Sequence, residues 1–334
     1  MTDILTSPKK NVIIDASILS SLMSCGCLTD LRYNHNFVSL DGKSNSLEVG
    51  SLVHKILEVY HKNMVNKIKR SDAISNAFLM GDTYIRGCSY CTDFEPIHDM
   101  LEMENILNDH ICFDKCILKP KCGHSPNEYP GLSNTPQESD RSKTGWKWAL
   151  TTLEQYFDYY KNDSWVTLEV EVVKKEILYE DDDIRIMWKA KLDRTVDTNQ
   201  GIFPVDVKTM KVRRDTVSLN NQFIGQCLIM KTRNVIIDKI GFQTTLEPKD
   251  KFLRTVVPYS ADRLLEWQSI TLPYWCKMYV MYHETGYWPQ NFTHCENKFG
   301  MCTFKGICES DRGMREEELK LHFKVGQAWE PSDD

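Results

Sequence analysis

The sequence lacks several features that would place it in a class at once. It has no apolar run approaching the length of a membrane span, although 41% of its 334 residues are hydrophobic and 26% are charged. It also lacks an internal repeat. The opening segment, MTDILTSPKK, holds no apolar stretch of signal-peptide length. We therefore expect a soluble protein in the reducing environment of the cytoplasm.

A basic excess is missing as well. The net charge is −6, which argues against a uniformly basic surface that wraps duplex DNA. The same charge permits a local basic groove around an acidic metal site. Charge therefore neither supports nor excludes a nucleic-acid partner.

The length and the apolar spacing predict one large α/β domain with insertions, rather than two equal halves. Helices are expected at 47–65, 146–161, 218–231 and 260–284. Strands are expected at 165–178, 184–196, 202–207, 234–246 and 252–258. Residues 66–145 are interpreted as an insertion with a long loop. The segment 286–334 is polar and cysteine-bearing, and we expect its last twenty or so residues to be frayed.

Two of the predicted strands carry acidic residues away from their apolar faces. In the strand 184–196 the alternating apolar residues form one face, which leaves Asp193 on the other. Asp206 and Lys208 share a face of the next strand. Neighbouring carboxylates repel unless a cation lies between them, and Mg²⁺ or Mn²⁺ suits oxygen ligands with open water positions. Such an ion can activate water for attack on phosphorus, with Lys208 beside it to stabilise charge. An Asp-x-Lys pair taken alone is more often an ordinary solvated face.

Four segments in order resemble the PD-(D/E)XK nucleases. Residues 191–194 (Lys-Leu-Asp-Arg) and 204–209 (Pro-Val-Asp-Val-Lys-Thr) resemble the family's core signature, with Asp206 in the middle acidic position. Residues 50–54 (Gly-Ser-Leu-Val-His) with 57–58 (Leu-Glu) resemble the first motif of the RecB-like branch, whose histidine is a metal ligand. Gln222 and Gln226 resemble the final Gln-Tyr motif, with glutamine in place of tyrosine. The resemblance spans roughly 25 to 308 in ordered pieces.

The resemblance implies a restriction-endonuclease-like core, in which helices flank a mixed central sheet, within a single nuclease domain over 1–334. The region 66–145 would be an insertion, and 286–334 a cluster-binding segment and tail. The implied catalytic residues are Asp193, Asp206, Lys208, His54, Glu58 and Gln222. Of these, His54, Asp193 and Asp206 would bind Mg²⁺ or Mn²⁺.

The implied activity is that of a DNA exonuclease acting on single strands or DNA ends. Relatives of this kind serve phage or bacterial recombination, repair or CRISPR adaptation, which also implies a helicase or recombination partner. Two alternatives stay open. One is a structure-specific or restriction-like endonuclease, which shares the same active site. The other is a non-catalytic nucleic-acid-binding subunit.

Twelve cysteines in a reducing compartment favour metal or cluster ligands where they are clustered. Cys295, Cys302 and Cys308 are close in sequence. The segment 17–25, which ends at Cys25, resembles the N-terminal cysteine segment of iron-sulfur nucleases, with glycine at 26 for the usual proline. The resemblance implies a structural 4Fe-4S cluster on Cys25, Cys295, Cys302 and Cys308, with Cys27 as the alternative first ligand. By spacing alone, four thiolates suit a structural zinc equally well.

Further cysteines and basic residues lie outside these motifs. Cys88, Cys91, Cys122 and His124 could supply a tetrahedral Zn²⁺ site, and free cysteines explain the pattern equally well. Cys227 and Cys276 lie on apolar helical faces and are expected in the core. Directly after the active-site lysine come candidate phosphate contacts, Lys211, Arg213 and Arg214, for which a solvated turn is the alternative.

Overall fold

The computed structural model describes residues 9–40, 45–85, 139–210, 220–242, 246–297 and 300–327. Their strands are β1 (Lys10–Ile14), β2 (Phe37–Ser39), β3 (Val166–Glu180), β4 (Ile184–Thr198), β5 (Gly201–Met210), β6 (Asn234–Gly241), β7 (Phe252–Pro258), β8 (Glu296–Asn297), β9 (Gly300–Met301) and β10 (Phe323–Val325). The α-helices are α1 (Ala16–Ser24), α2 (Gly26–Thr29), α3 (Asn45–Val65), α4 (Arg70–Ile85), α8 (Ser139–Tyr159), α9 (Asn221–Ile229), α10 (Pro248–Lys251), α11 (Ala261–Glu266), α12 (Leu272–Thr285), α13 (Lys305–Glu309) and α14 (Arg315–His322). The protein is therefore a mixed α/β structure.

A mixed six-stranded sheet, with the order β1-β4-β5-β6-β7 and β3 paired to β4, forms its centre. Strand β3 runs antiparallel along one edge of β4. Two strands share the other edge of β4: β1 pairs in parallel with Ile184–Trp188, and β5 pairs antiparallel with Arg194–Thr198. Residues 189–193 of β4 lie between these two ladders, and Asp193 lies where β5 begins to separate from β4.

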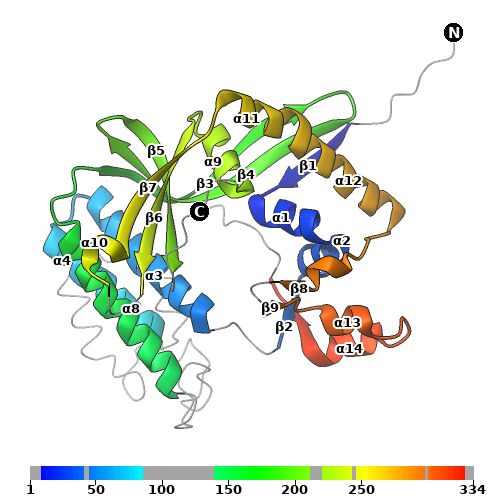
Figure 1. Cartoon of the computed structure of the whole chain (residues 1–334), viewed down its shortest axis with the longest axis horizontal. Helices are drawn as coiled ribbons and strands as arrows, with labels where there is room; N and C mark the ends of the chain where they lie inside the picture. Colours follow the sequence, from blue (N-terminus) through cyan, green and yellow to red (C-terminus); the bar gives the residue numbers. More distant parts are fainter. Residues whose placement is uncertain are drawn as a thin grey trace, which may run out of the picture.

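Helices cover both faces of this sheet (Figure 1). On one side, α3, α4 and α8 pack on β5, β6 and β7 around a core that includes Leu52, Ile56, Leu153, Val207 and Phe252. On the other side, α1, α9, α11 and α12 pack on the sheet around a second core that includes Leu19, Trp188, Phe223, Ile237 and Cys276. The expected sheet with flanking helices is confirmed at this level.

Helix α9 begins at a side-chain cap and lies very close to β4. The Asn220 side chain accepts a hydrogen bond from the Gln222 backbone N–H at 2.8 Å, which fixes the first turn. A Cβ at Gly225 would lie 2.3 Å from the Trp188 ring nitrogen. Only glycine allows this approach, which holds the start of α9 beside the end of β5.

The segment expected to be frayed is folded as far as the structure describes it. Residues 315–322 form α14, and β10 pairs antiparallel with β2, so Phe323 lies opposite Ser39. Phe323 is buried and stacks on Phe304 with ring centroids 4.8 Å apart. The N-terminal β2 and the C-terminal helices therefore share a small core (Figure 1). For residues 315–327 the expectation was wrong, because the buried aromatic residue Phe323 anchors an otherwise polar segment; residues 328–334 lie outside the described part of the chain.

The helices and strands differ from the expected ones in several other places. The helix expected at 260–284 contains a π-helical turn, η2 (Trp267–Thr271), just before Pro273, a residue that cannot donate a helical hydrogen bond. Within the range 66–145, α4 packs against α3, and α8 begins at Ser139. Strand β6 ends at Gly241, before the expected end at 246. Among the described residues, no helix has both the length and the apolarity to cross a bilayer.

Candidate metal centre and cysteine cluster

His54, Glu171 and Asp193 bring ligand atoms to one point. His54 Nδ1 lies 3.5 Å from Asp193 Oδ2. One ligand atom from each of the three residues lies within 4.8 Å of the others, and in the described part of the chain no other such group of three occurs. All three side chains are partly exposed, so the point can be reached from solvent.

The β3–β4 ladder positions Glu171, which the sequence interpretation missed. Val170 pairs with Arg194 and Val172 with Leu192, so Glu171 stands across from Asp193. Glu171 has a φ of 54°, in the left-handed region that a residue with a Cβ rarely adopts, and its carboxylate pairs with Lys191 Nζ at 3.0 Å. Strain of this kind gathers at functional sites. An acidic residue in the strand before Asp193 was the available signal.

The Asp193 carboxylate binds the backbone of β5 at the point where the pairing between β4 and β5 ends. Its Oδ2 accepts a hydrogen bond from the Val207 backbone N–H of β5 at 2.7 Å, just beyond the last residue pair of the β4–β5 ladder. Burial and the nearby Asp206 charge raise the pKa of Asp193 to about 6, against the opposing effects of His54 and of this hydrogen bond. Asp193 therefore carries an anionic charge that its surroundings do not fully compensate.

Asp206, Lys208 and Gln222 form the adjoining half of the centre. Asp206 is 1% exposed. Its Oδ1 accepts from Gln222 Nε2 at 2.6 Å, and its Oδ2 forms an ion pair with Lys208 Nζ at 2.7 Å. Lys208 also donates to Gln222 Oε1 at 3.4 Å. The Lys208 ammonium is thus the partner of Asp206 Oδ2, and this oxygen has a second lone pair that can face another ligand.

Two residues of the expected motifs lie elsewhere. Glu58 pairs with Lys62 at 2.9 Å and with Lys55 at 3.4 Å on its own helix. Burial raises the pKa of Glu58, but the two lysines outweigh burial, and the net shift is downward. Gln226 is buried and its Oε1 has no hydrogen-bond partner. The structure thus brings five of the six expected catalytic residues together, and it places Glu58 among lysines.

The donor set fits a hard divalent cation. It offers one imidazole nitrogen from His54 and carboxylate oxygens from Glu171 and Asp193, with the carboxylate of Asp206 close enough to act on the charge of Asp193. Oxygen-rich donors of this kind favour Mg²⁺ or Mn²⁺ over metals that prefer thiolates. A cation among these groups would also offset the repulsion between the neighbouring carboxylates of Asp193 and Asp206.

Five cysteines from opposite ends of the chain meet beside α13. Cys27 Sγ lies 3.8 Å from Cys308 Sγ, although 281 residues separate them in sequence. Cys295 and Cys302 are near enough for the charges of Cys25 and Cys308 to raise their pKa values further, after burial. The Cys25 sulfur accepts a hydrogen bond from the Asn291 backbone N–H at 3.4 Å. Cys227 and Cys276 are buried in the core, as expected.

Within the cysteine group the thiol pKa of Cys308 is lowered, whereas the pKa values of Cys27, Cys295 and Cys302 are raised. The hydrogen bond between Cys27 and Cys308 lowers the pKa of Cys308 to about 6, and the same contact raises the pKa of Cys27. A thiolate is the form that binds metals. Among the described residues, no three of these sulfurs lie within 4.8 Å of one another. Sulfurs around a single tetrahedral zinc, with bonds of about 2.3 Å, would all lie about 3.8 Å apart.

Several expected residues lie outside the described part of the chain. These are the second candidate zinc set, Cys88, Cys91, Cys122 and His124, and the candidate phosphate contacts, Lys211, Arg213 and Arg214. Both remain predictions.

Comparison with known proteins adds little to this geometry. No family model matches the chain, and no curated protein matches it. One solved structure, described as "Crystal structure of SSO0001", is similar over 50% of this chain and 71% of its own, with 14% identity and a TM-score of 0.28. A similarity this weak does not place the chain in a family.

Proposed function

We propose that the protein is a metal-dependent DNA nuclease with a PD-(D/E)XK core, which hydrolyses phosphodiester bonds. The observation that carries this proposal is the convergence of His54, Glu171 and Asp193 beside the buried Asp206, with Lys208 and Gln222 on its carboxylate. Three carboxylates, one imidazole and one lysine at a partly open point suit the hydrolysis of a charged phosphodiester better than a solvated strand face.

The residues have distinct tasks in this reaction. His54, Glu171, Asp193 and Asp206 would hold Mg²⁺ or Mn²⁺, which supplies charge neutralisation at the phosphate and an activated water. Lys208 lies 2.7 Å from Asp206 and can donate to a phosphate oxygen as negative charge develops on it. Gln222 holds both Asp206 and Lys208 through its amide, so it fixes the distance between the acidic and the basic group.

We propose exonuclease action on single strands or DNA ends as the leading form of this activity, on the basis of the motif resemblance. Digestion of linear and circular single-stranded DNA separates the two nuclease forms. An exonuclease leaves circles intact, whereas a structure-specific or restriction-like endonuclease can open a circle. A protein that binds DNA and cleaves neither substrate would be the non-catalytic subunit.

We propose further that the cysteine group carries a structural 4Fe-4S cluster. The support for iron is the resemblance of residues 17–25 to the N-terminal cysteine segment of iron-sulfur nucleases, since the 3.8 Å between Cys27 Sγ and Cys308 Sγ is also the separation expected around a tetrahedral zinc. The contact between Cys27 and Cys308 supports Cys27, rather than Cys25, as the first ligand. The cluster would fasten the N-terminal α2 to the C-terminal segment.

The test of the nuclease proposal is digestion of end-labelled linear DNA with Mg²⁺ or Mn²⁺. We expect Asp206→Ala to abolish cleavage while DNA binding, followed by fluorescence anisotropy, survives. Asp206→Asn keeps the shape of the side chain and should also be inactive. Asp197→Ala, an exposed carboxylate on the same strand as Asp193, is the matched control. Equal cleavage by Asp206→Ala and the parent protein would refute the assignment.

A further inference from the structure

Helices α11 and α12, with η2 between them, form one continuous outer helix whose inner and outer sides differ (Figure 1). The inner side belongs to the core through the buried residues Leu264, Trp267, Leu272 and Cys276. The outer side shows exposed residues at intervals of three and four, which is the spacing of one helical face. We call this set the α11–α12 face, and it consists of Glu266, Ile270, Tyr274, Lys277 and Met281.

The centre of the α11–α12 face is apolar and open to solvent. Ile270 is 65% exposed and Tyr274 is 57% exposed, and the two residues are one helical turn apart. Met281, which is 43% exposed, continues the apolar side chains two turns further on. A single exposed apolar residue is ordinary on a protein surface. Apolar residues aligned along one helical face are instead typical of a helix that packs against another helix.

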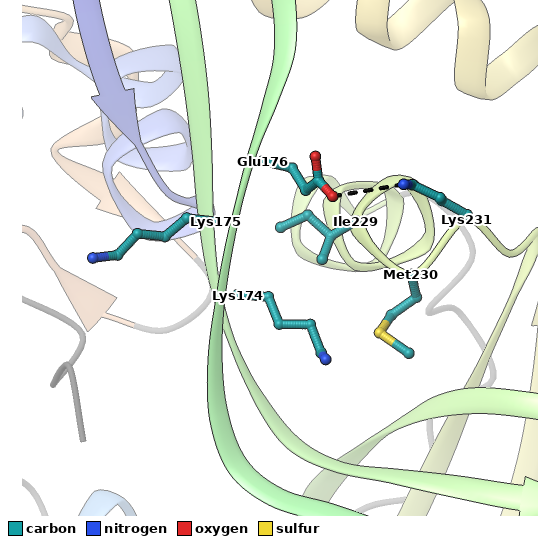
Figure 2. A pocket seen from close by; sticks show the side chains of 6 residues that line it. All are labelled: Lys174, Lys175, Glu176, Ile229, Met230 and Lys231. Atoms are coloured by element: carbon teal, nitrogen blue, oxygen red, sulfur yellow. Dashed lines mark ion pairs between the residues drawn. The ribbon is translucent and has the colours of Figure 1, made fainter.

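The pocket between β3 and α9 lacks such a surface (Figure 2). Its apolar lining residues, Ile229 and Met230, are buried and partly buried, respectively. Figure 2 shows the ion pair between Glu176 and Lys231, which are 3.7 Å apart. This pocket therefore offers little exposed apolar area to a macromolecular partner, unlike the α11–α12 face.

Opposite charges flank the apolar centre of the α11–α12 face at similar distances. Glu266 precedes Ile270 by four residues, and Lys277 follows Tyr274 by three. The point midway between the two charges thus lies between Ile270 and Tyr274, and the charges themselves are roughly 16 Å apart along the helix. A second copy rotated by 180° about this point, with its helix antiparallel, would set Glu266 of each chain against Lys277 of the other.

We propose that the α11–α12 face joins two copies of this chain in an antiparallel, two-fold symmetric helix pair. The proposal does not depend on the nuclease function. Ile270 and Tyr274 of one protomer pack on the same two residues of its partner, and an ion pair between Glu266 and Lys277 closes each end. A parallel pair would instead set Glu266 against Glu266 and Lys277 against Lys277, and such like-charge contacts suppress an arrangement.

The ion pairs within each chain extend this contact. Glu266 pairs with Arg263 at 2.9 Å, and Lys277 pairs with Asp181 at 2.8 Å. Across the interface the order becomes Arg263, Glu266, the partner's Lys277 and the partner's Asp181, so the signs alternate. Such a network contributes more than an isolated exposed pair. Because two single helices bury less surface than a standard interface, we expect a dissociation constant of about 1–10 µM.

The first test is sedimentation equilibrium of the full chain from about 1 to about 100 µM. Glu266→Lys and Lys277→Glu each create two like-charge contacts across the axis, so each should raise the dissociation constant at least about tenfold. Tyr274→Ala changes no charge and should also raise it. The matched control is Lys320→Glu, which reverses an exposed lysine that pairs with a glutamate elsewhere and should leave the constant unchanged.

The second test is an equimolar mixture of Glu266→Lys and Lys277→Glu. In the mixed dimer one interface pair carries both reversals and the other carries neither, so both pairs again join opposite charges. We therefore expect two variants that are monomeric alone to dimerise when mixed, with a dissociation constant close to that of the parent. Thermal unfolding of each variant alone checks that the reversal leaves the fold intact.

Three results would overturn the proposal. The first is a parent that stays monomeric up to about 100 µM. The second is an equal dissociation constant in the parent, both charge variants and Tyr274→Ala, which would assign the dimer to another surface. The third is a mixture that stays monomeric although each variant keeps the Tm of the parent, which would show that Glu266 and Lys277 do not face each other. None of these results depends on cleavage or on metal binding.

Discussion

At the scale of residues, the metal centre gathers carboxylates whose negative charges the neighbouring groups do not fully neutralise. Asp193 lies where β5 separates from β4, and its carboxylate accepts the backbone N–H of Val207. The neighbouring Asp206 is buried, and the Glu171 backbone has a left-handed φ. The burial of the Asp193 and Asp206 charges and the left-handed Glu171 backbone cost stability in the metal-free protein. A bound cation would offset the part that comes from charge.

The raised pKa of Asp193 gives a pH-dependent prediction. Burial, with the Asp206 charge, raises this pKa to about 6, above the value of about 3.9 expected in an unfolded chain. The folded, metal-free protein holds this proton more tightly than the unfolded chain does. The stabilising contribution of this group is therefore present below pH of about 4 and is lost as the pH rises to about 6.

We expect Asp193→Asn to have a higher Tm than the parent protein in EDTA. The difference should widen from pH about 4 to about 6 and then stay constant, because asparagine does not titrate. Thermal unfolding over this pH range measures it. Mn²⁺ at a fixed concentration should raise the Tm of the parent by more than that of the variant, which binds the ion more weakly. A difference that is independent of pH would show that the Asp193 charge is not buried in this way.

Much of the centre could be predicted from the sequence, because its residues lie on regular elements. The two-residue period of a strand placed Asp206 and Lys208 on one face, and the motif order added His54 and Gln222. Glu171 could not be found in this way, since no motif contains it and only the register of the β3–β4 ladder sets it opposite Asp193. Glu58 shares a helix face with His54, but its carboxylate forms ion pairs with Lys55 and Lys62 instead of joining the centre.

At the scale of elements, a buried ionic network joins the strands behind the centre. Asp238 on β6 is 0% exposed and accepts from Arg194 Nη2 at 2.9 Å, Arg254 Nε at 3.1 Å and the Tyr156 hydroxyl at 2.6 Å. Arg194 follows Asp193 directly in β4. The network thus ties β4, β6, β7 and α8 to one carboxylate, and it anchors the strand that carries Asp193.

We predict that Asp238→Ala destabilises the fold strongly. It would leave the buried Arg194 guanidinium without its carboxylate partner and Arg254 with Asp163 alone, and breaking a buried pair costs about 3–5 kcal/mol. Urea unfolding followed by tryptophan fluorescence measures the change in the free energy of unfolding. Glu316→Ala, which breaks an exposed ion pair with Lys320, is the control and should leave the midpoint unchanged. A midpoint for Asp238→Ala equal to that of the parent would show that the network is dispensable.

The elements that the sequence predicted best are those with a clear apolar period. Strand β7 has the bounds expected, and α3 starts within two residues of its expected start. The π-helical turn at Trp267–Thr271 was not predictable, because the apolar spacing continues through it and the cause lies in the accommodation of Pro273. Helix α4 was missed because its buried face mixes small and polar residues, such as Ala73, Asn76 and Ala77, with few large apolar ones, which weakens the apolar period.

At the scale of the whole molecule, the two ends of the chain are held together. The β2–β10 ladder, the core around Phe304 and Phe323, and the contact of Cys27 with Cys308 all join residues that are more than 260 positions apart. The cysteine spacing alone could suggest a shared site. Only the fold shows that Cys27, and not just Cys25, contacts the C-terminal group.

The cysteine proposal predicts the colour of the protein. Purified without oxygen, the parent should be brown and absorb visible light. Cys27→Ser and Cys302→Ser should lose the colour and lower the Tm, because the cluster fastens distant segments. Cys227→Ser replaces a buried cysteine in the core and should keep the colour. Colourless parent protein that contains zinc would overturn the iron assignment, and full colour in Cys27→Ser would restore Cys25 as the ligand.

The most direct test of the account is calorimetric titration of metal-free protein with Mn²⁺ at neutral pH. We expect one binding site in the parent, and an affinity at least about 10- to 100-fold lower in Asp193→Asn and Glu171→Gln. Glu58→Gln, on the same helix as His54 but paired with lysines, should bind Mn²⁺ as the parent does. Equal Mn²⁺ affinity in the parent, Asp193→Asn and Glu171→Gln would contradict the proposed cation site, and with it the nuclease mechanism.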